Sequence, residues 1–212
     1  ALLRQDHQNL GRRLFASHCS SCHLYNGHDG RGFPVEDSPS AADLAGFGSV
    51  EWITRLLDYD HYVSDKYFGG TKFKDGTMAR KVLAKYTEEE KALLPEIARL
   101  LADGAKLPYE EPLEEERREE LLSLYYNDDL DFEDGRSCIE CHDIDSEDEG
   151  SAPDLTGYAS REWLIEFIGN PEDDRFYGKK NDRMPCYARD GKLKPEEIAI
   201  LADWIRSTPA EF

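Results

Sequence analysis

The amino-acid sequence predicts an all-α protein built from two similar halves, and three observations support this. Residues 51–58 and 162–169 each place apolar side chains on one face of a short helix. Few segments show the strict apolar and polar alternation that marks a β-strand. Residues 43–52, DLAGFGSVEW, align without gaps on residues 154–163, DLTGYASREW, with six identities in ten positions.

The internal repeat continues downstream in the same order. Residues 66–70, KYFGG, correspond to residues 175–179, RFYGK, and the segments after Thr87 and Lys194 both open with acids suited to a helix N-terminus. We expect Pro95 to kink the first of these helices or to shift its start. The repeat predicts a first domain over 1–106, an acidic linker and leading helix over 107–134, and the core of a second domain over 135–212.

The net charge of −19 is concentrated near the middle of the chain, because residues 107–149 alone carry 18 acids and three bases. This balance disfavours nucleic-acid binding, which requires a positive surface. Within this region we expect a helix over Leu113–Tyr126 that buries Leu121, Leu124 and Tyr125. A solvated helix and linker is the simpler interpretation of the acidic run, and a docking surface for a basic partner is the alternative.

Each half contains one Cys-x-x-Cys-His motif, the attachment pattern for c-type haem. Two cysteine sulfurs three residues apart can reach two vinyl-derived carbons of one porphyrin, while the adjacent imidazole reaches its iron. We therefore predict two haem c groups, attached through the residues Cys19, Cys22, Cys138 and Cys141, with His23 and His142 as iron ligands. A four-cysteine zinc site or two disulfides are the alternatives.

The chain contains two methionines, one in each half, and a methionine is a suitable second axial ligand to haem iron. Met184 is predicted to serve the second haem, because no histidine follows His142. Met78 is predicted to serve the first haem, where four histidines compete with it: His7, His18, His28 and His61. Packing in the core is the plainer role for either methionine. We interpret Cys186 as a free, partly buried thiol.

These residues resemble the class I c-type cytochromes, and the resemblance covers nearly the whole chain twice. It implies two tandem cytochrome c-like domains, each wrapped around one haem c. In that family a proline presents its carbonyl to the haem-ligating imidazole; Pro153 matches this position and Ala42 replaces the proline in the first half. Trp52 and Trp163 resemble aromatic residues that line the haem edges, although core packing alone explains them equally well.

The tandem arrangement resembles the cytochromes c4 and, more specifically, the c-type segments attached to bacterial quinol:cytochrome c reductases. It implies an electron carrier between redox protein partners, near a membrane cytochrome complex of a respiratory quinol-oxidising chain, and not an enzyme by itself. A dihaem peroxidase-like enzyme is the alternative, and it needs an open iron site. A second alternative is a haem-based sensor or docking module, whose acidic segment offers four possible cation ligands: Asp143, Asp145, Glu147 and Glu149.

The resemblance also implies a periplasmic location or one at the outer face of the membrane. The sequence has no run of 18 apolar residues, so we expect the chain as given to be soluble.

Overall fold

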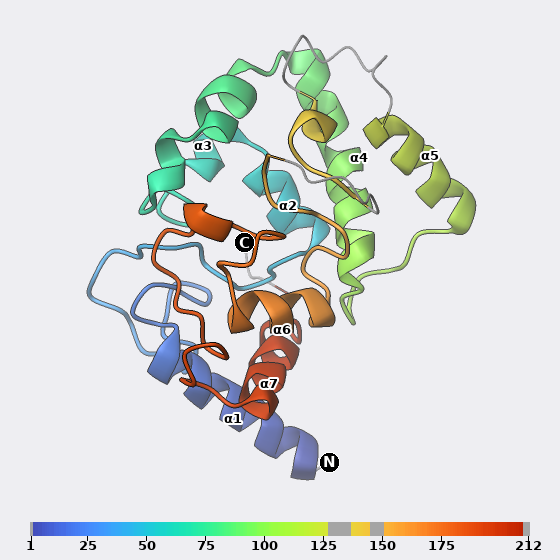
Figure 1. Cartoon of the computed structure of the whole chain (residues 1–212). Helices are drawn as coiled ribbons and strands as arrows, with labels where there is room; N and C mark the ends of the chain where they lie inside the picture. The colour runs from blue at the N-terminus through green and yellow to red at the C-terminus, as the bar shows by residue number, and fades with distance from the viewer. Residues whose placement is uncertain (1, 127–136, 145–150, 210–212) are drawn as a thin grey trace.

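The computed structural model describes residues 2–126, 137–144 and 151–209, and within these ranges it is helical (Figure 1). Short 3-10 or π turns lie between the helices, among them η2 at Met78–Val82 and η4 at Cys138–Glu140. The described part of the chain forms no β-strand, only isolated bridges around Tyr25 and His28, which confirms the predicted all-α class. The helices are α1 Leu2–His18, α2 Val50–Leu56, α3 Tyr59–Tyr62, α4 Glu88–Ala105, α5 Glu115–Tyr126, α6 Arg161–Gly169 and α7 Pro195–Ile205.

The helices begin where side chains satisfy their first free backbone N–H groups. Ser49 caps α2 and Ser160 caps α6, each accepting a hydrogen bond at 3.1 Å from the backbone N–H of the tryptophan three residues later. At α4, the Thr87 hydroxyl accepts from the Glu90 N–H while the Glu90 carboxylate accepts from the Thr87 N–H. The two matched segments of the repeat therefore start their helices with the same device.

Two details refine the expectations for these helices. Pro95 lies inside α4, which starts at Glu88, directly after its Thr87 cap, so the proline does not shift the start of the helix. In α5, Leu121 and Tyr125 are buried as expected, but Leu124 is only partly buried. Leu121 and Tyr125 lie four residues apart on the buried face of the helix, and Leu124 lies at the edge of that face.

The first helix of each half packs against the last helix of the other half. Helix α1 packs against α7, and α5 packs against α4, while α2 and α6 pack against the C-terminal helix of their own half (Figure 1). Phe15 of α1 lies 5.2 Å, between ring centroids, from Trp204 of α7. The predicted boundary after residue 106 stays a prediction, because each end of the core combines helices from both sides of it.

Matched positions of the repeat meet in the centre of the molecule. The rings of Phe47 and Tyr158 lie 5.5 Å apart. A Cβ on Gly48, whose φ is +83°, would lie 2.4 Å from the Cβ of Ala159. The described residues therefore share one continuous hydrophobic core, to which both halves contribute.

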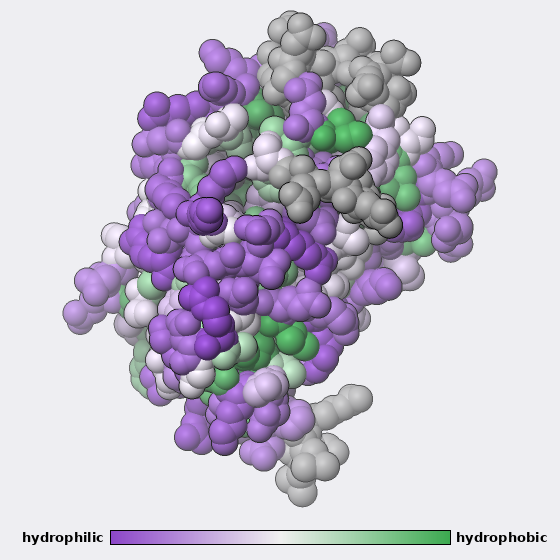
Figure 2. Space-filling model, in the orientation of Figure 1, coloured by the Kyte–Doolittle hydropathy of each residue, from purple (hydrophilic) through white to green (hydrophobic). Residues whose placement is uncertain are grey.

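Hydrophilic side chains cover most of the face shown in Figure 2, and apolar side chains show mainly in small areas between them. Among the residues that the structure describes, none of the helices has the length and apolar character needed to cross a membrane.

The close contact between α1 and α7 predicts opposite effects for two helical glycines. A Cβ on Gly11 would lie 2.4 Å from the Trp204 Cβ, whereas one on Gly104 meets nothing closer than 3.8 Å. We expect Gly11→Ala to lower the free energy of unfolding by about 1–3 kcal/mol, as overpacking does. The control Gly104→Ala should raise it by about 0.5–1 kcal/mol, through better helix propensity. Urea unfolding followed by circular dichroism measures both, and equal stabilisation by the two changes would contradict the packing of α1 on α7.

Candidate functional site

Both Cys-x-x-Cys-His motifs form the same tight backbone turn. The N–H of His23 donates to the Cys19 carbonyl at 2.8 Å, and that of His142 donates to the Cys138 carbonyl at 2.9 Å. The first turn continues directly from α1, since the Cys19 N–H donates to the Phe15 carbonyl, whereas the second begins with η4. In each motif the turn brings the first cysteine and the histidine to neighbouring positions.

None of the five cysteines, all of which the structure describes, forms a disulfide. Burial raises the pKa of Cys19 to about 12 and that of Cys138 to about 11, so both thiols are protonated at neutral pH. Within the described ranges, no group of three or more His, Cys, Asp or Glu side chains lies close enough to hold a metal ion. The described cysteines therefore form neither of the predicted alternatives, two disulfides or a four-cysteine zinc site.

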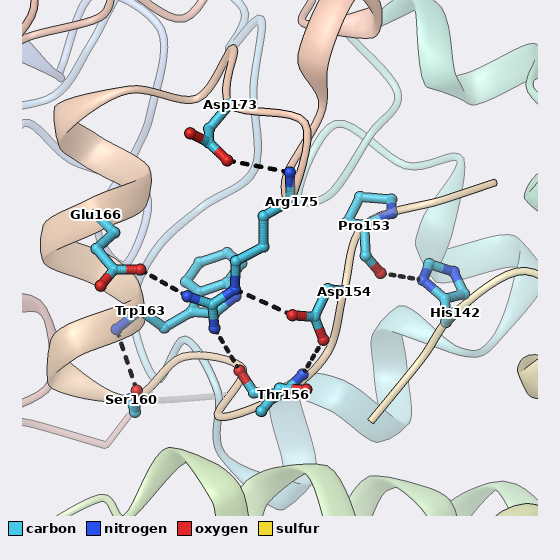
Figure 3. Close-up of polar contacts among 9 residues, drawn as sticks. All are labelled: His142, Pro153, Asp154, Thr156, Ser160, Trp163, Glu166, Asp173 and Arg175. Atoms are coloured by element: carbon cyan, nitrogen blue, oxygen red, sulfur yellow. Dashed lines mark hydrogen bonds and ion pairs between the residues drawn. The ribbon is translucent and has the colours of Figure 1, made fainter. Parts of the chain in front are cut away.

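Each motif histidine is oriented by one backbone carbonyl. The Nδ1 atom of His23 lies 2.7 Å from the carbonyl oxygen of Ala42, and that of His142 lies 2.7 Å from the carbonyl oxygen of Pro153 (Figure 3). Burial lowers the pKa of both histidines, and the hydrogen bond to the carbonyl acts against that shift. A neutral imidazole that donates through Nδ1 carries its lone pair on Nε2, the form that binds iron.

The aspartates after these two carbonyls, Asp43 and Asp154, hold the carbonyl segments in place. Asp43 is 3% exposed and accepts hydrogen bonds from the backbone N–H groups of Asn26, Gly27 and Ala45 at 2.9–3.0 Å. Asp154 accepts from the Thr156 N–H at 2.7 Å. We did not predict these aspartates as site residues, although each opens a matched DLxG string.

Arg175 joins three acceptors of the second half in one network. Its guanidinium donates to the Asp154 carboxylate at 3.0 Å, to the Glu166 carboxylate at 2.6 Å and to the Thr156 carbonyl at 3.0 Å (Figure 3). The corresponding residue of the first half is Lys66. A planar guanidinium can hold three acceptors in fixed directions, which an ammonium group cannot.

The two matched tryptophans differ in the state of the indole N–H. That of Trp52 donates to the Asp43 carbonyl at 3.0 Å. That of Trp163 is buried and has no hydrogen-bond partner among the described residues. An unpaired buried donor costs about 1–3 kcal/mol. An acceptor supplied by a bound group, such as a carboxylate, would relieve that cost.

The structure also describes both candidate distal ligands, Met78 and Met184. Met78 opens η2 and Met184 lies in the loop before α7, and both side chains are partly buried. Two competing histidines have other partners: Nδ1 of His61 lies 2.7 Å from Asp58, and Nδ1 of His28 accepts from the Gly30 N–H at 3.0 Å. Of the others, His7 is exposed and His18 is partly buried. Cys186 is 1% exposed, in keeping with a buried thiol.

Of the predicted cation ligands, only Asp143 belongs to the described residues. Asp145, Glu147 and Glu149 lie outside them.

The family model for cytochrome c matches residues 132–209. No curated protein and no solved structure gives a significant match to the chain. The paired thiols, the oriented neutral imidazole and the unpaired indole donor of the matched region fit a covalently bound haem c. The match and the donor set together support a c-type cytochrome that transfers electrons through haem.

Proposed function

We propose that this chain is a dihaem c-type cytochrome that relays electrons between protein partners. The observation that carries the proposal is the repeated ligand geometry: both motif histidines face a carbonyl oxygen at the same Nδ1 to oxygen distance of 2.7 Å. A structural Cys-x-x-Cys-His turn needs no such orientation, whereas an iron ligand does.

The backbone around the first motif supports a haem there as well, although the family model matches only the second half. Just after the carbonyl segments, the N–H of Leu44 donates to the Leu24 carbonyl and that of Leu155 donates to the Asp143 carbonyl. Each acceptor is the residue that follows the motif histidine. Further on, the Tyr67 N–H donates to the Ser64 carbonyl as the Phe176 N–H donates to the Asp173 carbonyl. The two halves thus share one scaffold, which we propose to be two cytochrome c-like units with one haem c each.

We further propose Met78 and Met184 as the distal ligands, one to each iron. Haem c supplies a one-electron couple when bound, and a thioether opposite an imidazole raises its reduction potential. The chain's own contribution is to keep the imidazole neutral, to direct Nε2 and to limit access of water to the iron. With both axial positions filled, no site is left for a substrate, which favours a carrier over a dihaem peroxidase-like enzyme.

The proposed setting is the periplasm or the outer face of the membrane, beside a quinol-oxidising respiratory complex. Exposed carboxylates of α5, Glu115, Glu116 and Glu119, are suited to steer a basic redox partner. Arg117 is already engaged by Glu96 at 2.6 Å and by Glu120 at 2.8 Å, so it offsets little of this charge. A solvated acidic helix without a partner is the competing explanation.

The number of haems is the first test. We expect a pyridine haemochrome assay to give two covalent haems per chain, and Cys138→Ala/Cys141→Ala or Cys19→Ala/Cys22→Ala to leave one each. Cys186→Ala, at the fifth cysteine, is the control and should leave two. A single haem that disappears with the Cys138 and Cys141 changes, and is unaffected by those at Cys19 and Cys22, would rule out the dihaem proposal.

Carbon monoxide separates the carrier from the peroxidase-like enzyme. We expect the reduced wild-type protein to show no carbon monoxide spectrum under native conditions, because both irons are six-coordinate. Met78→Ala and Met184→Ala should each open one iron and bind one equivalent. Binding by the unaltered protein would instead favour the peroxidase-like function.

Salt dependence tests the docking surface. We expect Glu115→Gln/Glu116→Gln/Glu119→Gln to slow electron transfer to a basic acceptor such as a cationic cytochrome at low salt, and the difference to vanish near 1 M salt, where the Debye length is about 3 Å. The control Glu36→Gln/Asp37→Asn changes exposed acids outside α5. Slowing by the control in proportion to its two removed charges, against three in α5, would show that net charge, and not this surface, steers the partner.

A further inference from the structure

Each Cys-x-x-Cys-His motif adjoins a helix that packs on a helix of the opposite half. The first motif continues α1, which packs on α7. The second motif lies beside α5, which packs on α4, and the Tyr125 hydroxyl of α5 donates to the His142 carbonyl at 2.9 Å. In Figure 1, α1 lies against α7, and the segment from residue 138 to 144 lies with α4 and α5.

The chain segment that carries Met184 crosses between the halves just before the methionine. Lys180 still contacts its own half, donating to the Ser151 carbonyl at 2.6 Å. At the next residue, the Asn181 carbonyl accepts from the Lys72 ammonium of the first half at 3.0 Å. Arg183 then donates to the Gly70 carbonyl at 3.2 Å. Met184 therefore follows directly on a contact with the first half.

The contact at Gly70 leads to the first motif. A Cβ on Gly70 would lie 2.3 Å from the Pro39 carbonyl oxygen, so the two backbones touch. The next residue, Ser40, donates its N–H to the Cys22 carbonyl at 3.1 Å. The residue before Met184 is thus joined to the Cys22 backbone through a short series of packed segments.

The other side of Met184 reaches the same motif directly. The hydroxyl of Tyr187, three residues on, donates to the carbonyl of His18, the residue before Cys19. Burial raises the pKa of Tyr187, and the neighbouring Cys19 and Cys22 add to that shift. Met184 therefore lies between the contact of Arg183 with Gly70 of the first half and the contact of Tyr187 with the residue before the first motif.

The chain after Met78 shows the reciprocal relation. Tyr86, which ends this stretch of turns, makes a side-chain hydrogen bond with Cys138 of the second motif that partly offsets the effect of burial on that thiol. The chain then enters α4, which packs on α5. Met78 thus belongs to the segment that approaches the second motif.

We propose that axial ligation is crossed: Met184 binds the iron held by Cys19, Cys22 and His23, and Met78 binds the iron held by His142 and its two cysteines. This inference rests on the proposed dihaem function and reverses the pairing expected from sequence order. Each haem site is then completed by the opposite half, so neither half makes a whole site. Binding of one haem would order residues that the other half needs.

Single-haem proteins test the pairing. Cys19→Ala/Cys22→Ala leaves only the second haem, and in that background we expect Met78→Ala to abolish the iron–sulfur absorption band of the oxidised protein. Met184→Ala should leave the band in place and serves as the matched control. In the reciprocal background, Cys138→Ala/Cys141→Ala, the roles of the two methionines should exchange. The opposite pattern in either background would overturn crossed ligation.

The haem content and the methionine pairing distinguish a failure of the proposed function from a failure of crossed ligation. Absence of covalent haem from the unaltered protein defeats the proposed function, whereas haem with the opposite pairing defeats crossed ligation alone. A band that survives both methionine changes removes both methionines as ligands, and crossed ligation with them.

If the single-haem proteins do not fold, as judged by circular dichroism, the unaltered reduced protein answers the same question by NMR. The ring current of a haem shifts the methyl group of its methionine ligand strongly upfield. The upfield methyl signal that disappears in Met184→Ala should show Overhauser contacts to the haem bonded to Cys19 and Cys22. Contacts to the haem bonded to Cys138 and Cys141 would contradict the proposal.

Discussion

The hydrogen bond between each motif histidine and a backbone carbonyl is the interaction around which the site is built. It sets the tautomer and direction of a half-buried imidazole, and burial keeps that imidazole neutral. The carbonyl is useful only if its segment is rigid. Asp43 and Asp154 supply that rigidity by accepting hydrogen bonds from the backbone N–H groups of Ala45 and Thr156 in the same loops. In the first half the aspartate lies after an alanine, so its hydrogen bonds replace the rigidity that a proline provides in the second.

The packing of helices across the two halves has a physical cause in the small size of each half. Two small halves have little apolar surface each, and a shared core buries more of it than two separate ones. The close meeting of Gly48 with Ala159, and of Gly11 with Trp204, shows how tightly the shared core is packed. An arrangement of this kind couples the two proposed haem sites mechanically, since the helices that complete one site continue the chain of the other.

Much of the local structure could be predicted from residue patterns alone. The capped starts of α2, α4 and α6, the buried Leu121 and Tyr125, and the two Cys-x-x-Cys-His turns all depend on neighbours within a few residues. Leu124 and Pro95 were harder to predict. The burial of Leu124 depends on the width of the surface that α4 offers, and the effect of Pro95 depends on how the rest of α4 is held.

The sequence by itself determined the helical class, the internal repeat and the residue types of two Cys-x-x-Cys-His motifs, because each can be recognised in short strings of residues without knowing how the helices pack. Only the tertiary structure decided which half packs on which. Two copies of one pattern can pair within themselves or with each other, and the apolar faces are similar in both cases. Contacts such as Tyr187 with His18, and Arg183 with Gly70, join residues more than 100 positions apart, so no local pattern could select between the two arrangements.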